Sequence, residues 1–413
     1  MNNKNNMLLV LAAAGLVVGA WGLVDRLLHG LTPVAFGSVI PWGLWVAFYL
    51  LFLGLSAGAF LVTILAYVFG QKRFEAAAPL AAFIVLVALL CEVQFILLDL
   101  GTMHRAFYRF FLSPNPASMM FWMMVLFSAM LVLYLVKTCL LIRGSMVAWA
   151  ADETRCCRGL YRFLRFGLTA YGPAERESDH RLVKRLSWIS LPVGLLFYWA
   201  NGAFFAVVPG RPLWNSALTP PLFVVAALLS GGALLAFLML ALRGGDEEGR
   251  EVGLGLGRVV FHLLVVFLIL ELTQFFVASA SGRLDAAFAL ERIVSSGGGL
   301  LFGFVHLGLG GLLPLILLRS GAGSPKAVAW ACALIVLTFI SFRFNFVVAD
   351  LAVTRLEGLE PFYVHARLSA DYVPNLNEWL VSLWVVSSGV LAFALGTRYL
   401  PVSGPLNGGE SHV

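Results

Sequence analysis

The chain alternates between long apolar segments and short polar connections. Each of ten apolar segments comes close to the roughly 20 residues that a helix needs to cross a hydrocarbon layer. Inside lipid a helix satisfies its own backbone hydrogen bonds, so each segment is predicted to be a transmembrane helix. The ten segments are 7–24, 42–70, 77–100, 119–142, 187–209, 219–242, 254–281, 297–318, 325–351 and 380–400. The pattern therefore predicts an all-α, polytopic membrane protein with about ten transmembrane helices.

The composition leaves little room for a soluble domain. Hydrophobic residues make up 60% of the 413 residues and charged residues 12%, with a mean hydropathy of +0.90. In soluble domains about half of the residues are hydrophobic and about a quarter are charged. The net charge of +6 comes from basic residues in the connections, which indicates membrane orientation rather than nucleic-acid binding. The five cysteines form no CxxC pair, so they give no signal for a zinc site or an iron–sulfur cluster.

The basic residues are distributed unequally between the two sides of the membrane. Eighteen lysines and arginines fall on the side of the N-terminus and eight on the other, and nine of the eighteen lie in the connection 143–185. The positive-inside rule then predicts that both termini are cytoplasmic and that the connection after Asp99 lies outside. The first apolar segment has no strongly basic leader and no small-residue cleavage site, so we expect a retained helix.

An internal repeat is visible in two short motifs. Residues 55–59 (Leu-Ser-Ala-Gly-Ala) resemble 229–233 (Leu-Ser-Gly-Gly-Ala), and 92–95 (Glu-Val-Gln-Phe) resemble 271–275 (Glu-Leu-Thr-Gln-Phe). Parallel repeats are common in membrane transport folds, and we expect two parallel four-helix bundles with flanking helices. Close helix packing alone would also explain the small residues. The predicted organisation is a flanking helix in 1–40, a first bundle in 41–210, a second bundle in 211–351, and a loop with a C-terminal helix in 352–413.

Two acids stand on one face of the third apolar segment. Glu92 and Asp99 are seven residues apart, which is two helical turns and about 10 Å. An acid inside an apolar membrane segment is a functional-site candidate, and this pair suits a proton relay. The alternative is an interfacial ion pair between Asp99 and Arg105, with Glu92 as a protonated packing residue. His104 follows the helix end and can titrate near neutral pH.

The second half carries its own set of polar residues inside apolar segments. Arg343 and Asp350 are again two turns apart on one helix. Such a set is either a proton path or a structural ion pair, and the sequence leaves both open. His262 and His306 lie at different depths, so they do not match the paired axial ligands of a haem. The set consists of His262, Glu271, Gln274, His306, Arg343, Asn345 and Asp350.

Three polar residues in the first half have weaker signals. Lys137 lies near one end of its apolar segment, and we expect its long side chain to extend toward the membrane surface. Tyr198 and Asn201 lie in an apolar setting, where they could hydrogen-bond a ligand or simply pack in the core.

Six short motifs are distributed along the chain. They are 41–45 (Pro-Trp-Gly-Leu-Trp), 52–60 (Phe-Leu-Gly-Leu-Ser-Ala-Gly-Ala-Phe), 99–101 (Asp-Leu-Gly) with Arg105, 114–119 (Pro-Asn-Pro-Ala-Ser-Met), 211–215 (Arg-Pro-Leu-Trp-Asn) and 372–378 (Tyr-Val-Pro-Asn-Leu-Asn-Glu). The motifs resemble those of the NrfD/PsrC family of quinone-linked membrane subunits. The later ones are similar to its ten-helix branch, which includes the membrane subunits of the Qrc menaquinone reductase, the Dsr complex and alternative complex III.

The resemblance implies a helical subunit of the bacterial inner membrane that holds no haem or iron–sulfur cluster of its own. It implies a quinone bound near the periplasmic face, in the first bundle. Matched by position, it places the quinone pocket at Gly54, Ser56, Gly58, Asp99, His104 and Arg105, to which Asn201 is added as a candidate ligand. It also suggests a proton path through Glu92, His262, Glu271 and Asp350, to which Arg343 is added because of its spacing from Asp350.

The resulting hypothesis is the quinone-reactive subunit of a respiratory oxidoreductase, inactive alone. Electrons would pass between a periplasmic, ferredoxin-like iron–sulfur partner and menaquinone. Reduction of menaquinone is the favoured direction. Asp99, His104 and Glu92 are the candidate catalytic residues. Other expected partners are membrane lipid and molybdopterin-family or multihaem cytochrome c subunits, with no nucleic acid. A proton-coupled secondary transporter and a purely structural membrane anchor are the alternatives.

Overall fold

The computed structural model of the chain describes residues 2–153, 155, 157–295, 299–353 and 365–403. This described part is helical and contains no strand. The longer helices are α1 (Asn2–His29), α2 (Leu44–Thr63), α3 (Ala78–Asp99), α5 (Met119–Ala151), α7 (Pro173–Ala206), α8 (Thr219–Arg243), α9 (Glu247–Ala280), α13 (Pro325–Leu351) and α14 (Leu376–Tyr399). The shorter elements are η1 (Ile64–Val68), η2 (Lys72–Ala77), α4 (Met103–Leu112), α6 (Arg158–Leu164), α10 (Leu284–Val294), η3 (Leu300–Leu312), α12 (Leu313–Ser320) and η4 (Ala366–Leu368).

Ten helical spans in this part of the chain are long and apolar enough to cross a membrane. They coincide with the ten segments predicted from the sequence, so the predicted polytopic all-α fold is confirmed. The bounds differ most for α5 and α7, which have 33 and 34 residues and continue into the connection 143–185. Arg, Lys and Glu are frequent in that connection, and they favour helix nearly as well as apolar residues do. Its charged residues therefore prolong both helices.

Helix ends follow local signals in the sequence. Proline occupies the first turn of α3, α7, α8 and α13, where its missing N–H costs no intrahelical bond. Asn375 caps α14 by accepting a hydrogen bond from the N–H of Glu378, whose carboxylate accepts one from the N–H of Asn375. This reciprocal capping box fixes the start of α14.

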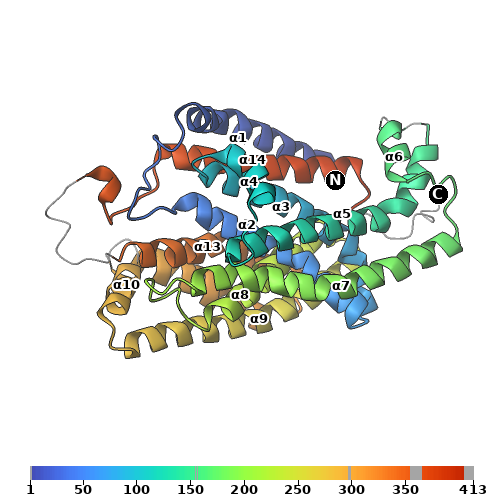
Figure 1. Ribbon diagram of the computed structural model, residues 1–413. Helices are drawn as coiled ribbons and strands as arrows, with labels where there is room; N and C mark the ends of the chain where they lie inside the picture. Colours follow the sequence, from blue (N-terminus) through green and yellow to red (C-terminus); the bar gives the residue numbers. More distant parts are fainter. Residues whose placement is uncertain (1, 154, 156, 296–298, 354–364, 404–413) are drawn as a thin grey trace.

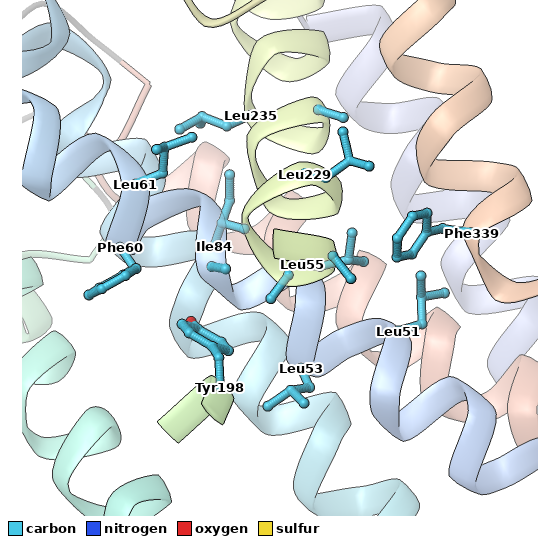
Figure 2. Close-up of a cluster of buried hydrophobic side chains, with 14 of the residues drawn as sticks. Leu51, Leu53, Leu55, Phe60, Leu61, Ile84, Tyr198, Leu229, Leu235 and Phe339 are labelled. Carbon is cyan, nitrogen blue, oxygen red and sulfur yellow. The ribbon is translucent and has the colours of Figure 1, made fainter. Parts of the chain in front are cut away.

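The central contact of the molecule is between α2 and α8. α2 also packs against α3, α7 and α13, while α8 packs against α7, α9 and α13. Figure 2 shows the apolar side chains at this centre, including Leu55 of α2, Leu229 of α8 and Phe339 of α13. On one side of this centre, α5 packs against both α3 and α7. On the other side, η3 and α12 pack against α13. Two halves therefore meet along α2 and α8.

The first and last helices form a pair. α1 and α14 lie side by side along one edge of the molecule (Figure 1), and α14 packs on α3. The side chain of Asn5, at the start of α1, donates to the carbonyl of Ala394 near the end of α14. The chain therefore begins and α14 ends at the same end of the molecule. We call this the Lys72 end, and the opposite one, where α3 finishes, the Asp99 end.

Candidate functional site

Asp99 is the last residue of α3, and its carboxylate lies beside a buried arginine. Its Oδ1 atom is buried and has no hydrogen-bond partner in the part of the chain that the structure describes. The guanidinium of Arg26, from the end of α1, lies within electrostatic range of this carboxylate. Arg26 is 1% exposed and donates from Nε to the carbonyl of Leu98 and from Nη2 to that of Leu100, both at 2.8 Å. Arg26 thus caps the carboxyl end of α3 and holds Asp99 in place.

A second buried acid belongs to the same end. Glu378 of α14 accepts hydrogen bonds from the Ala35 N–H at 3.0 Å and the Tyr372 hydroxyl at 2.8 Å, and it lies within electrostatic range of Asp99. The hydroxyl of Tyr372 in turn accepts from the N–H of Leu44 at 2.8 Å. Burial, and secondly the nearby Glu378 carboxylate, raise the pKa of Tyr372 above its usual value. Glu378 therefore fastens the segment between α1 and α2 to α14, close beside Asp99.

The residues that follow Asp99 lie on the surface. His104 and Arg105 belong to α4, a short helix, and both are exposed. The His104 ring lies 6.3 Å from the ring of Tyr108. The structure shows no ion pair between Arg105 and Asp99 among the described residues, and Arg26 stands beside Asp99 in its place.

Glu92 lies two turns deeper on α3 and is 1% exposed. Its Oε2 atom has no hydrogen-bond partner within the described ranges. The phenols of Tyr49 and Tyr198 are within electrostatic range of Glu92, and the Tyr49 hydroxyl donates to Oδ1 of Asn201. Between Glu92 and Asp99 on the same helix, the Phe95 ring stacks on that of Phe48, with centroids 5.3 Å apart. An aromatic wall thus separates two acids.

The small residues of α2 serve the contact with α8. A Cβ atom added at Gly58 would lie 2.9 Å from the carbonyl carbon of Gly231, and one at Gly54 would meet the Ser230 hydroxyl. Ser56 instead faces α7, where its hydroxyl lies 3.1 Å from that of Tyr198. Gly54 and Gly58 are therefore filled by protein atoms of α8 and do not border a space for a ring.

The second half contains a buried carboxylate–imidazole pair. Nε2 of His306 lies 2.9 and 3.0 Å from the two oxygens of Glu271, and both side chains are buried. His306 sits in the π-helical segment η3, and π-helical turns are frequent at functional sites. The rings of Phe302 and Phe342 lie on the imidazole, at 5.6 and 5.5 Å. The two rings shield the carboxylate–imidazole pair on the side of the histidine.

A small cavity adjoins this pair. Its volume is about 20 Å³, which is room for about one water molecule. Two of the polar atoms at its lining, Oε1 of Gln274 and Nδ2 of Asn345, have no hydrogen-bond partner among the described groups. The lining residues are Leu213, Leu222, Glu271, Gln274, Phe275, Ile293, Phe302, Phe342, Asn345 and Phe346. The cavity is too small for a quinone ring and suits a water next to Glu271.

The other residues of the predicted proton path lie apart from Glu271. Asp350 accepts hydrogen bonds from the N–H groups of Leu213 and Trp214, at 3.3 and 2.9 Å, and so anchors the segment before α8. Arg343 makes no ion pair with Asp350 among the described residues, and its guanidinium lies 4.7 Å from the Phe223 ring centre. His262 is exposed, and its Nδ1 lies 2.7 Å from the carbonyl of Arg258 on its own helix.

The expectation that Lys137 extends toward the membrane surface is wrong. Lys137 is 0% exposed, and Nζ donates to the hydroxyls of Thr63 at 3.1 Å and Ser190 at 3.2 Å. The reason is the position of α5, which turns this side chain between α2 and α7. Sequence reasoning also missed Arg26 and Glu378. Both are charges that border an apolar segment, and Glu378 also ends the motif 372–378, but neither signal reveals a partner in another helix.

The sequence matches known membrane subunits over most of its length. The family profile described as "Polysulphide reductase, NrfD" matches residues 33–354. A selenate reductase subunit of Mesobacillus selenatarsenatis is 28% identical over 391 residues, which cover 94% of this chain and 92% of the relative. A putative dimethyl sulfoxide reductase membrane subunit of Halobacterium salinarum is 29% identical, covering 94% and 89%. The Hdr-like menaquinol oxidoreductase integral membrane subunit of Archaeoglobus fulgidus is 25% identical, covering 95% and 92%.

Proposed function

This chain belongs to the NrfD family, and from that premise we propose that it is the quinone-reactive membrane subunit of a respiratory oxidoreductase. The relatives named above are a selenate reductase subunit and membrane subunits named for a dimethyl sulfoxide reductase and a menaquinol oxidoreductase, which supports membership in an oxidoreductase complex. Menaquinone is the proposed substrate, and its reduction the proposed direction.

Reduction of a quinone to a quinol adds two electrons and two protons. A site for it requires an apolar slot, hydrogen-bond donors for the carbonyls and an acid within reach. The observation that carries the proposal is the buried, unpaired Oδ1 of Asp99, at the end of α3 and next to the Phe48–Phe95 aromatic wall. Asp99 would donate a proton to a quinone oxygen, and Arg26 would keep the carboxyl group oriented. Glu92, two turns deeper, would resupply Asp99.

The surface at the Asp99 end is the proposed contact with the electron-donating partner. α4 presents His104 and Arg105 to the outside at this end, next to Asp99 in the sequence. We place an iron–sulfur subunit there, with His104 at the mouth of the quinone site. The distribution of basic residues supports a periplasmic Asp99 end, two cytoplasmic termini and the bacterial inner membrane. Molybdopterin-family or multihaem cytochrome c subunits would complete the complex.

The second half is proposed to couple turnover to proton movement. Glu271 and His306 form the buried acid–base pair that such a function requires, beside a cavity with room for about one water. Arg343 of α13 lies between the halves, because its guanidinium neighbours Gly54 of α2 and is within electrostatic range of Tyr49. His262 and Asp350 do not contact this pair, so the proposed path includes fewer residues than the sequence predicts.

The test is purification of the chain from its native membrane with whatever subunits accompany it. We expect an iron–sulfur subunit to co-purify and its reduced clusters to be oxidised by added menaquinone analogue, while the isolated chain reduces none. A chain that purifies alone and drives solute uptake in vesicles would instead establish the transporter. A complex that keeps quinone turnover after replacement of Asp99 and Glu92 would establish the anchor.

A further inference from the structure

Lys137 is a buried cation without an acidic partner. It forms no ion pair with a carboxylate among the described residues, and its nearest groups are the Thr63 and Ser190 hydroxyls and the Tyr134 ring, whose centre lies 4.5 Å from Nζ. An ionisable residue inside a membrane segment is expensive and marks ion or proton pathways. An apolar side chain of the same length would pack here without that cost. The position of Lys137 therefore needs a chemical reason.

A stripe of hydroxyl groups on α2 begins at this lysine. Tyr49, Ser56 and Thr63 are spaced by seven residues, so they lie on one face of the helix about 10 Å apart. Each makes a hydrogen bond to a polar group of another helix. Tyr49 bonds to Asn201, Ser56 pairs with the Tyr198 hydroxyl, and Thr63 accepts from Lys137. The stripe therefore continues through most of the thickness of the bundle.

α7 carries a matching stripe that faces the first. Ser187, Ser190, Tyr198 and Asn201 are separated by three or eight residues, which keeps them on one helical face, and all four are buried. The same face reaches the Lys72 end at His180, which is exposed and whose ring lies 5.7 Å from that of Tyr67. The column thus has a titratable residue at its surface.

The far end of the column is an acid. Tyr198, in the middle of the stripe, lies within electrostatic range of both Tyr134 and Glu92. Oε2 of Glu92 is buried and has no hydrogen-bond partner in the described residues, and the hydroxyl of Tyr134 is buried beside Thr63. The step past Tyr134 exceeds a single hydrogen bond, so it requires rotation of that hydroxyl or a bridging water. From Glu92 the route continues to Asp99, two turns or about 10 Å further along α3, and this step past the Phe48–Phe95 wall requires bridging waters.

We propose that this column is a proton route from the Lys72 end to the quinone site and that Lys137 is its proton-loading residue. This proposal rests on the proposed function, because the quinone consumes the protons. Each quinone takes two electrons from the iron–sulfur partner and two protons from the compartment at the Lys72 end. His180 receives them at the surface, Lys137 relays them past Thr63, and Glu92 delivers them to Asp99. Since electrons enter at the opposite end, each turnover separates charge across the membrane.

The test uses the whole complex in liposomes, with a pH-sensitive dye in the compartment that the Lys72 end faces. Lys137→Met removes the ammonium and keeps an unbranched side chain. Tyr198→Phe removes one hydroxyl of the column. Thr138→Val is the matched control, because Thr138 is also buried on α5 but bonds only to the carbonyl of Tyr134. Both column variants should slow proton uptake from that compartment by about tenfold or more, with unchanged quinone affinity. The control should match the wild type.

Proton uptake from that compartment at the wild-type rate in both column variants would overturn the proposal. If Lys137→Met does not assemble, Tyr198→Phe decides, because it changes neither charge nor much volume. If the wild type reduces no quinone, the proposed function has failed, and the column is tested without turnover. The infrared carboxyl band of Glu92, assigned with Glu92→Gln, should then exchange in D₂O about tenfold more slowly in Lys137→Met. Equal exchange rates would refute the column.

Discussion

Adding one methyl group at Gly58 should push α2 and α8 apart and destabilise the contact between the two halves. The Cβ of Gly58→Ala would lie 2.9 Å from the carbonyl carbon of Gly231, about 0.5 Å inside ordinary contact at 3.4 Å, with the carbonyl oxygen nearer still. These atoms are backbone of α8, so no side-chain rotation relieves the clash and the helices must move apart. Overpacking of a core costs about 1–3 kcal/mol, and a backbone obstacle places this variant near the upper value. Alanine regains about 1 kcal/mol of helix propensity.

The expected net loss is therefore about 2 kcal/mol in the free energy of unfolding. It is measured by titrating the purified protein in dodecyl maltoside with sodium dodecyl sulfate and following circular dichroism. Gly159→Ala in α6 is the control, because a Cβ there meets nothing within 4 Å. That variant should be as stable as the wild type or slightly more so.

The reciprocal substitution sharpens the test. A Cβ at Gly231 would lie 2.8 Å from both the carbonyl carbon of Ala57 and the carbonyl oxygen of Gly54, so Gly231→Ala should lose a similar amount. Because the two glycines touch, the double variant should deviate from additivity by more than about 0.5 kcal/mol. Additive losses, or a Gly58→Ala variant as stable as the control, would show that α2 and α8 do not cross at this point.

Three further substitutions separate structural from functional charges. Arg26→Met should cost about 3 kcal/mol in unfolding free energy and most quinone turnover, because it strips the carboxyl end of α3 and leaves Asp99 without its cation; unchanged turnover would remove Arg26 from the site. Asp350→Ala should cost about 2 kcal/mol, because two buried N–H groups lose their acceptor, with coupling unaffected in liposome potential measurements. Glu271→Gln should leave quinone reduction in detergent nearly unchanged and lower the membrane potential in liposomes without abolishing it, because the column of α2 and α7 still takes protons from the Lys72 end; a dye signal equal to the wild type would remove the second half from the mechanism.

The ten helices could be predicted because each apolar segment is long and bounded by charges. Lipid allows an apolar segment of that length little other than a helix, so the prediction needs no knowledge of tertiary contacts. The candidate acids Glu92 and Asp99 could also be found, since ionisable residues stand out in an apolar sequence. These are properties of one helix at a time.

The partners of the charged residues could not be predicted. Arg26 reaches Asp99 because α1 packs against α14, which in turn packs on α3, and these segments are far apart in the sequence. His306 meets Glu271 because η3 is π-helical, which turns its side chains relative to an α-helix of the same sequence. Lys137 points into the bundle because of the rotation of α5 about its axis. Helix rotation and register are set by packing, and a uniformly apolar segment carries little amphipathic pattern to indicate them.

The central claim is that the Asp99 carboxyl group donates a proton to a quinone at the end of α3. The most direct measurement is quinone reduction by the purified complex carrying Asp99→Asn, which keeps the side-chain shape and hydrogen bonding but cannot release a proton. The account predicts an assembled complex that binds menaquinone analogue with normal affinity and has lost turnover by about a hundredfold or more. Near-normal turnover in an assembled Asp99→Asn complex would contradict the claim and move the site elsewhere.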